Sequence, residues 1–96
     1  MNKEETIKLF HQGRDAWNIW AWTGRSNINA VADFQGHVFE EEVDFSDFRF
    51  PADALFNNVI FKKKAIFQGC IFEGNVDFSN LRFNNAVFFE IGRAHV

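Results

Sequence analysis

Phenylalanine recurs along the middle of the chain at alternating intervals of five and six residues. Two intervals make an 11-residue unit, which occurs five times before a further phenylalanine opens a sixth. The phenylalanines that keep this spacing, which we interpret as the structural core, are Phe34, Phe39, Phe45, Phe50, Phe56, Phe61, Phe67, Phe72, Phe78, Phe83 and Phe89. Self-similarity at a fixed period outweighs local propensity and predicts an all-β solenoid of stacked units.

Each unit predicts short extended sides joined by tight corners. Around the phenylalanines, inward and outward positions alternate with the period of a strand, over stretches too short for a helix. The third position always holds a residue that tolerates left-handed or turn conformations, namely Gly36, Asp47, Asn58, Gly69 and Asn80. If four phenylalanines point inward per coil, two units make one coil, which gives a 22-residue period. About three coils then stack at the strand spacing of about 4.8 Å.

The residues before the repeat predict one amphipathic helix over residues 3–22. Its apolar stripe comprises Ile7, Phe10, Trp17 and Trp20. Asn2 suits the N-cap, Gly13 would allow close approach of the helix backbone, and Gly24 is a stop signal. Because a solenoid must cover its first open coil, we interpret this helix as a cap in preference to a ligand-binding aromatic box.

The repeat resembles that of the pentapeptide-repeat proteins, in the variant where five-residue and six-residue units alternate. The segments FEEEVDF, FQGCIFEGNVDF and FSNLRF carry the match, and LFHQGRDAWNIW resembles the helix that often precedes such repeats. The resemblance implies a right-handed, four-sided parallel β-helix over residues 31–89, after a capping helix and link over residues 1–30. His37 and Phe48 replace the small residue usual at the fourth position, so we expect a local distortion of the first coil.

The composition fits a dry interior and excludes several classes of function. Fourteen phenylalanines and no tyrosine supply rings with no polar tip to satisfy. The net charge of −3 argues against a general nucleic-acid binder, which needs a basic footprint. A single cysteine excludes an internal disulfide, and no Cys/His spacing is typical of a metal site. No stretch has the pattern of a signal peptide or the length of an apolar membrane span, so we expect a cytoplasmic protein with no membrane partner.

Two charged triplets should meet on the surface. Glu40–Glu42 and Lys62–Lys64 stand two units apart in the sequence, so three acids should lie beside three bases on adjacent coils. Opposite charges on neighbouring strands contribute roughly 0.2–1 kcal/mol per pair and help to set the register. A binding patch is the alternative interpretation. Ile66 and Phe88, also two units apart, are the candidate for a small apolar surface contact.

No set of residues predicts catalysis, a cofactor or a metal centre. Cys70 points inward, where a thiol behaves as a small hydrophobe, and His37 should lie at the edge of the core beside the cap. Asp33 and Asp77 are two coils apart with Leu55 between them, so we expect solvated strand-edge aspartates without coupled acid/base chemistry. We therefore expect a protein that is not an enzyme.

The last residues depart from the repeat after Phe89. Residues 90–96 lack the phenylalanine that the sixth position requires, and the segment IGRAHV resembles translated sequencing-adapter DNA. We therefore expect a non-native or disordered tail that packs poorly. The natural protein would then be longer, with further coils, and it could dimerise end to end through its exposed strand edge.

These features favour a structural or protein-interaction module with a protein partner and no direct contact with nucleic acid. Some proteins with the implied fold are similar to duplex DNA in width and charge and act on type II topoisomerases such as gyrase. A DNA-mimic modulator of that kind is the alternative. Residues 28–89 sum to only −4, and the lysine triplet interrupts any acidic stripe, which favours the interaction module.

Overall fold

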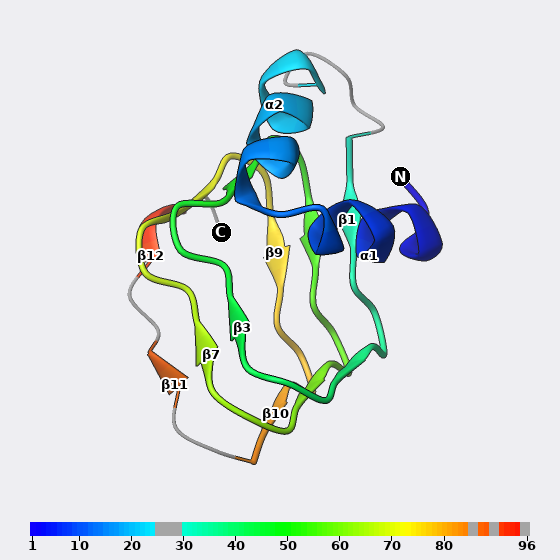
Figure 1. Ribbon diagram of the computed structural model, residues 1–96, viewed down its shortest axis with the longest axis vertical. Helices are drawn as coiled ribbons and strands as arrows, with labels where there is room; N and C mark the ends of the chain where they lie inside the picture. Colours follow the sequence, from blue (N-terminus) through cyan, green and yellow to red (C-terminus); the bar gives the residue numbers. More distant parts are fainter. Residues whose placement is uncertain (25–29, 85–86, 89–90, 95–96) are drawn as a thin grey trace.

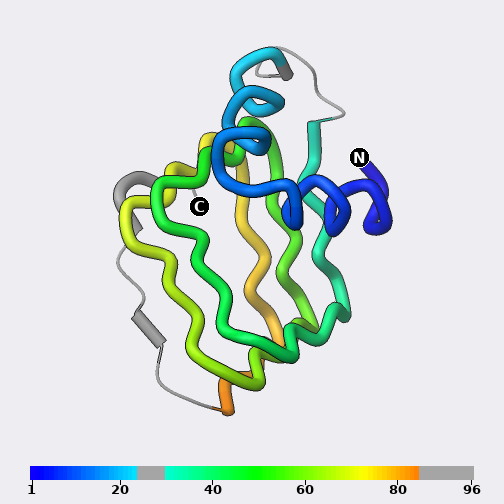
Figure 2. Tube along the Cα trace, viewed as in Figure 1, coloured from blue at the N-terminus to red at the C-terminus, as the bar shows by residue number. Residues whose placement is uncertain are grey.

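The computed structural model describes residues 1–24, 30–84, 87–88 and 91–94 and, within them, places two short helices before twelve short strands. The helices are α1 (Lys3–His11) and α2 (Arg14–Gly24). The strands are β1 (Ala32–Asp33), β2 (Val38–Phe39), β3 (Val43–Asp44), β4 (Arg49–Phe50), β5 (Ala54–Leu55), β6 (Ile60–Phe61), β7 (Ala65–Ile66), β8 (Cys70–Phe72), β9 (Val76–Asp77), β10 (Arg82–Phe83), β11 (Val87–Phe88) and β12 (Ile91–Ala94). Successive turns of the chain run alongside one another, with the helices next to the first turn (Figures 1 and 2).

The strands form four sheets, each of three parallel strands. The sheet orders are β1-β5-β9, β2-β6-β10, β3-β7-β11 and β4-β8-β12. Except at Ile91 in β12, paired residues stand two repeat units apart in the sequence, as in Ala32 with Ala54 and Val43 with Ala65. We call β1–β4 the first turn, β5–β8 the second and β9–β12 the third, since each turn contributes one strand to every sheet. The predicted period is confirmed, and the arrangement is compatible with a β-helix.

The chain before the strands forms two helices, so the prediction of one helix over residues 3–22 is wrong. Asn2 caps α1 as expected: its side chain accepts a hydrogen bond from the N–H of Glu5 at 2.8 Å, and the Glu5 carboxylate accepts one from the N–H of Asn2 at 3.1 Å. Gly13 then adopts a φ of +101°, which separates α1 from α2. No described atom would lie within 4 Å of a Cβ at Gly13, so this glycine permits the change of direction and not the close approach that we expected.

Left-handed backbone at the third position of each unit turns the chain between the sheets. The φ angle is +62° at Asp47 and Asn58, +57° at Asn80, +69° at Gly36 and +75° at Gly69. Residues other than glycine rarely adopt this backbone region, and among them asparagine and aspartate tolerate it best. The sequence prediction for this position is confirmed in all five units.

The phenylalanine rings stack in columns along the direction of strand pairing. Rings that are two units apart in the sequence lie nearly parallel, with 4.8 Å between the centroids of Phe34 and Phe56 and 4.7 Å between those of Phe50 and Phe72. This is about the distance between paired strands, so the backbone ladder sets the spacing of the rings. Rings of neighbouring columns meet edge to face, as Phe45 and Phe56 do at 85°.

Burial of the predicted core decreases toward the third turn. The phenylalanines of the first two turns are at most 3 % exposed, namely Phe34, Phe39, Phe45, Phe50, Phe56, Phe61, Phe67 and Phe72. In the third turn Phe78 is half-buried and Phe83 is 39 % exposed, and Phe89 lies outside the described residues. Phe48 is also buried, and the pairing of Arg49 with Ile71 beside it keeps the two-unit register, so the ladder is regular where we expected a distortion.

The helices cover the first turn with aromatic and aliphatic side chains. Trp17 is fully buried, and its indole stacks on the Phe34 ring with 5.7 Å between centroids. Ile7, Phe10 and Trp20 are partly buried against the same core. All four residues of the predicted capping stripe therefore belong to the core or pack against it, although they come from two helices.

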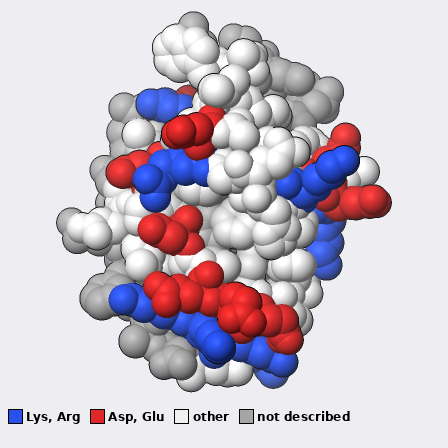
Figure 3. Space-filling model, viewed as in Figure 1, with Lys and Arg blue, Asp and Glu red and all other residues white. Residues whose placement is uncertain are grey.

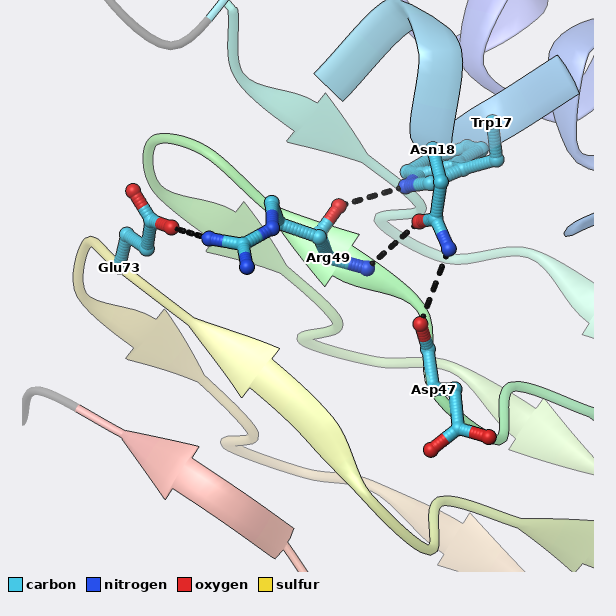
Figure 4. A network of polar contacts seen from close by, with 5 residues as sticks. All are labelled: Trp17, Asn18, Asp47, Arg49 and Glu73. Atoms are coloured by element: carbon cyan, nitrogen blue, oxygen red, sulfur yellow. Dashed lines mark hydrogen bonds and ion pairs between the residues drawn. The ribbon is translucent and has the colours of Figure 1, made fainter. Parts of the chain in front are cut away.

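Polar groups of α2 take the place of a neighbouring strand beside β4 (Figure 4). The Asn18 side chain accepts a hydrogen bond from the N–H of Arg49 at 2.9 Å and donates one to the C=O of Asp47 at 3.0 Å. The indole N–H of Trp17 donates to the C=O of Arg49 at 2.8 Å. The Arg49 guanidinium reaches the next turn, where it pairs with the Glu73 carboxylate. The edge of β4 is thus satisfied without another strand.

Replacing Asn18 with leucine, which is of similar size, should lower the free energy of unfolding by about 1–2 kcal/mol. The N–H of Arg49 would lose its partner in a part-buried place, and the C=O of Asp47 would lose one in an exposed place. Equilibrium unfolding in urea measures the loss. The matched control is Asn57→Leu, because the Asn57 side chain bonds only the exposed side chain of Gln35, and its effect should stay within about 0.5 kcal/mol. Equal losses in the two variants would contradict this role of Asn18.

Residues 91–94 form β12, which pairs in parallel with β8. The sequence did not predict this backbone pairing. The side chains of residues 91–94 and the whole of residues 90, 95 and 96 lie outside what the structure describes, so the poor packing of the tail stays a prediction. Backbone pairing depends little on side-chain identity, and an open strand edge offers N–H and C=O groups to any extended segment. The register shifts between Ile91 and Arg93: Ile91 pairs with Cys70, one residue out of the two-unit register, whereas Arg93 and Ala94 keep that register with Ile71 and Phe72.

Candidate interaction surface

Two rows of opposite charge face each other on the first and second turns. The Nζ of Lys62 lies 2.9 Å from a carboxylate oxygen of Glu40, and that of Lys63 lies 3.4 Å from one of Glu41. These are two of the three predicted pairs, and they confirm that the two triplets share a face. All four side chains are more than half exposed, so solvent screens the pairs and each contributes at most about 0.5 kcal/mol. On the face shown in Figure 3 an acidic band lies directly against a basic band.

A groove of about 540 Å³ lies beside the end of α1 and over β2 and β3, and we call it the β2–β3 groove. Phe10 and Phe39 line its apolar part, together with the imidazoles of His11 and His37. The segment 40–44 lines its acidic part. Sequence reasoning missed this groove, because its shape depends on where α1 ends and on the change of direction at the following glycine.

His37 adds no positive charge to the groove at neutral pH. Its ring meets that of Phe39 edge to face, with 4.5 Å between centroids. Burial lowers the pKa of His37, and the charge of Lys3 and the neighbouring His11 imidazole lower it further. His37 therefore does not offset the negative charge that the carboxylates of segment 40–44 bring to the groove.

The outer face of α2 exposes two large apolar side chains. Ile19 is 67 % exposed and Trp22 is 59 % exposed. They are three residues apart on one helical face and border a shallow hollow of about 480 Å³. The three tryptophans thus have two roles: Trp17 is part of the core and Trp20 packs against it, whereas Trp22 faces outward.

The predicted surface contact between Ile66 and Phe88 is placed only at the level of the backbone. β11 pairs with β7 so that Phe88 lies opposite Ile66, which is half-buried. The side chain of Phe88 lies outside what the structure describes. On its other side Ile66 is paired with Asp44, so the apolar column does not continue into the first turn.

Aspartates at the last position of the repeat unit stabilise the turn that follows each of them. Asp33, Asp44 and Asp77 each accept a hydrogen bond from the N–H two residues further on, at 2.7–3.0 Å. These are Asx turns, and the signal for them was an aspartate at a fixed place before each corner. Burial of Asp44 alone would raise its pKa, but hydrogen bonds from Ser46 and the charge of Arg14 produce a net lowering.

Cys70 belongs to the core, as the sequence predicts. It is fully buried, and its Sγ donates to the C=O of Phe45 at 2.9 Å. Burial raises the pKa of the Cys70 thiol to about 12. A nucleophilic cysteine needs a lowered pKa, since the thiolate is the reactive form. The arrangement therefore suppresses thiol chemistry.

The free energy of unfolding should fall with rising pH between about 9 and about 12. The thiol pKa is about 12 when folded against an ordinary value of 9.0, so the unfolded chain loses its proton first. The stabilisation is complete below pH 9 and decreases by about 1.4 kcal/mol per pH unit above it. Urea unfolding of the natural chain and of Cys70→Ala across this range isolates the effect, because lysines titrate in both. Parallel profiles of the two proteins would contradict the prediction.

The comparisons with known proteins assign no family. A scan against protein-family models finds no match, and searches of the curated proteins and of the solved structures find no significant match. Within the described part of the chain, no three or more His, Cys, Asp or Glu side chains are grouped so that they could hold a metal ion. Neither helix of that part combines the length and the apolar character needed to cross a bilayer. The role of this chain has to be inferred from its own surfaces.

Proposed function

We propose that this chain is a non-enzymatic structural or protein-interaction module of the pentapeptide-repeat type, built as a right-handed, four-sided parallel β-helix. One observation carries the proposal. The stacked phenylalanine columns inside and the rows of outward-pointing residues, such as Val38 beside Ile60, repeat in the same two-unit register. Stacked repeats of this kind present extended surfaces to partners. A frame that is already ordered loses little conformational freedom when it binds, which favours recognition.

The placement of the chemically reactive groups also supports a non-enzymatic role. The thiol of Cys70 is held protonated in the core. Asp33, Asp44 and Asp77 act in turns, and Glu40 is paired with a lysine. Each of these groups contributes to the fold or to its register. The outward rows remain as the part of the chain that a partner could recognise.

Site-specific photo-crosslinking in cells that express the chain tests the proposal. A photoreactive amino acid is placed at one of four half-buried outward positions, one for each sheet, namely Leu55, Ile60, Ile66 and Ile71. We expect a discrete crosslinked protein product from one or two adjacent faces and none from the others. The same products from all four faces, or none from any face, would contradict an interaction module.

The alternative, a DNA-mimic modulator of a type II topoisomerase such as gyrase, predicts a different result. The purified chain should then inhibit supercoiling in a dose-dependent manner. We expect no inhibition, because the acidic row carries lysine partners and lacks the uninterrupted negative charge of a phosphate backbone. If the chain inhibited supercoiling, and still did so after Lys62→Gln and Lys63→Gln, DNA mimicry would be favoured over the interaction module.

A further inference from the structure

The first turn has four backbone edge positions that point away from the second turn. In a parallel pair, alternate residues direct their N–H and C=O groups to opposite sides. Val43 and Phe45 donate to the C=O groups of Lys64 and Ile66 in the second turn, so Asp44 between them faces the other way. The same alternation places Asp33, Val38 and Arg49 on this outer edge, one in each of the remaining sheets.

The two helices cover two of these four positions. The Thr6 hydroxyl accepts a hydrogen bond from the N–H of Asp33 at 3.1 Å. On the other covered side, Asn18 and Trp17 satisfy the N–H and C=O of Arg49. The cap therefore closes the edges of β1 and β4 with side chains that replace a strand.

The edges of β2 and β3 are left open. The alternation directs the backbone N–H and C=O of Val38 and Asp44 away from the second turn, and in the described part of the chain no hydrogen bond from outside the sheets reaches these groups. Val38 is 36 % exposed, and the β2–β3 groove runs over both residues. An open strand edge beneath a groove is the geometry that receives an added strand from another chain.

The charges of the groove specify the character of that strand. The carboxylates of Glu40 and Glu41 are paired with lysines, and that of Asp44 lies 3.6 Å from Arg14. Glu42 also lines the groove and makes no ion pair within the described part of the chain. One carboxylate thus remains to receive a cation.

We propose that the β2–β3 groove binds an extended basic peptide segment of a partner protein by strand addition. The proposal rests on the proposed function and names a surface for it. The backbone groups of Val38 and Asp44 bond the peptide backbone, Glu42 accepts from a lysine or arginine, and an apolar peptide side chain packs against the half-buried ring of Phe10, which itself contacts Phe39. A second copy of this chain is disfavoured as the occupant, because two copies of this edge would bring their acidic rows together.

Fluorescence anisotropy with labelled alternating peptides tests the proposal. The probe is a hexapeptide of three Lys-Val repeats, and its controls are the Glu-Val counterpart and a Lys-Val peptide N-methylated on alternate amides. We expect saturable binding of the first peptide and at least tenfold weaker binding of both controls. No saturable binding of the Lys-Val peptide, or equal binding of the N-methylated one, would overturn strand addition.

Variants and amide signals locate the binding. Glu42→Gln should weaken binding of the Lys-Val peptide several-fold, whereas Asp15→Asn, the same change of charge on α2, should leave it unchanged. The amide resonances of Val38 and Asp44 should shift on titration, and that of Leu55 in the second turn should not. Equal weakening in both variants, or unmoved Val38 and Asp44 signals, would overturn the site.

The crosslinking experiment separates this inference from the proposed function. Face-specific crosslinks without peptide binding would contradict this inference alone. If neither face-specific crosslinks nor peptide binding were found, the proposed function would be contradicted as well.

Discussion

Replacing Phe56 with alanine is expected to lower the free energy of unfolding by about 3–5 kcal/mol. Phe56 is fully buried in the second turn, stacked between Phe34 at 4.8 Å and Phe78 at 5.5 Å. Its loss would interrupt a column and leave a cavity that the paired strands around it cannot close. Because small domains are stable by only about 5–15 kcal/mol, the melting temperature should fall by roughly 15–30 °C.

Phe83→Ala is the matched control, since it deletes the same atoms at the end of a column. Phe83 is 39 % exposed and stacks on one described ring of its column, that of Phe61 at 5.3 Å. Its loss should be less than half of that at Phe56, because a truncated side chain at a partly open site leaves no closed cavity. Thermal unfolding followed by circular dichroism, with urea titrations, measures both. Equal losses would contradict the view that a ring gains its stabilising effect from its place between two turns.

The phenylalanine spacing predicted the period, the number of sheets and the inward residues, because two independent constraints agree. Backbone pairing stacks positions that are two units apart, and the rings at Phe34 and Phe56 can stack only in that register. The corner residues followed from a third constraint, since Asp47 and Asn58 occupy a left-handed region that few other side chains accept. Local and long-range preferences thus point to one arrangement.

The division of the N-terminal segment into two helices at Gly13 could not be predicted from the sequence in the same way. The stripe that contains Phe10 and Trp17 fits one helix or two that meet at an angle. A glycine inside a helical pattern gives no sign of its φ, because it tolerates helical and left-handed backbone alike. The structure resolves the ambiguity through Trp17, whose indole must reach both the Phe34 ring and the C=O of Arg49. A second helix with its own direction allows both contacts.

The β2–β3 groove could not be predicted from the sequence, because it depends on which strand-edge positions the two helices leave uncovered. Thr6 and Asn18 carry the hydrogen bonds that close two edges, and neither stands out among the polar residues of the helices. Their role depends on where each helix sits on the first turn, which no pattern in the chain specifies. The repeat itself is nearly uniform around the turn, so the asymmetry that makes Val38 and Asp44 accessible comes from the helices alone.

Gly74→Ala should lower the free energy of unfolding by about 3 kcal/mol, at the upper end of the usual cost of overpacking. A Cβ at Gly74 would lie 2.5 Å from the carbonyl carbon of Ala52 and 2.7 Å from the nitrogen of Asp53. These are backbone atoms of the turn beneath, so the clash can be relieved only by separating two paired turns. The φ of Gly74 lies outside the left-handed region, and the cost is therefore one of space.

Two further variants separate this steric effect from the conformational freedom of glycine. Gly36→Ala places a Cβ no closer than 3.8 Å to a described atom, the Nζ of Lys3, and should cost only the roughly 1–2 kcal/mol of a left-handed alanine. Ala52→Gly should not rescue Gly74→Ala, because the obstructing atoms belong to the Ala52 backbone and remain in place. Urea unfolding of the single and double variants measures both effects. Rescue would show that the side chain of Ala52 is the obstacle, and the close approach of the two turns would then not account for the glycine.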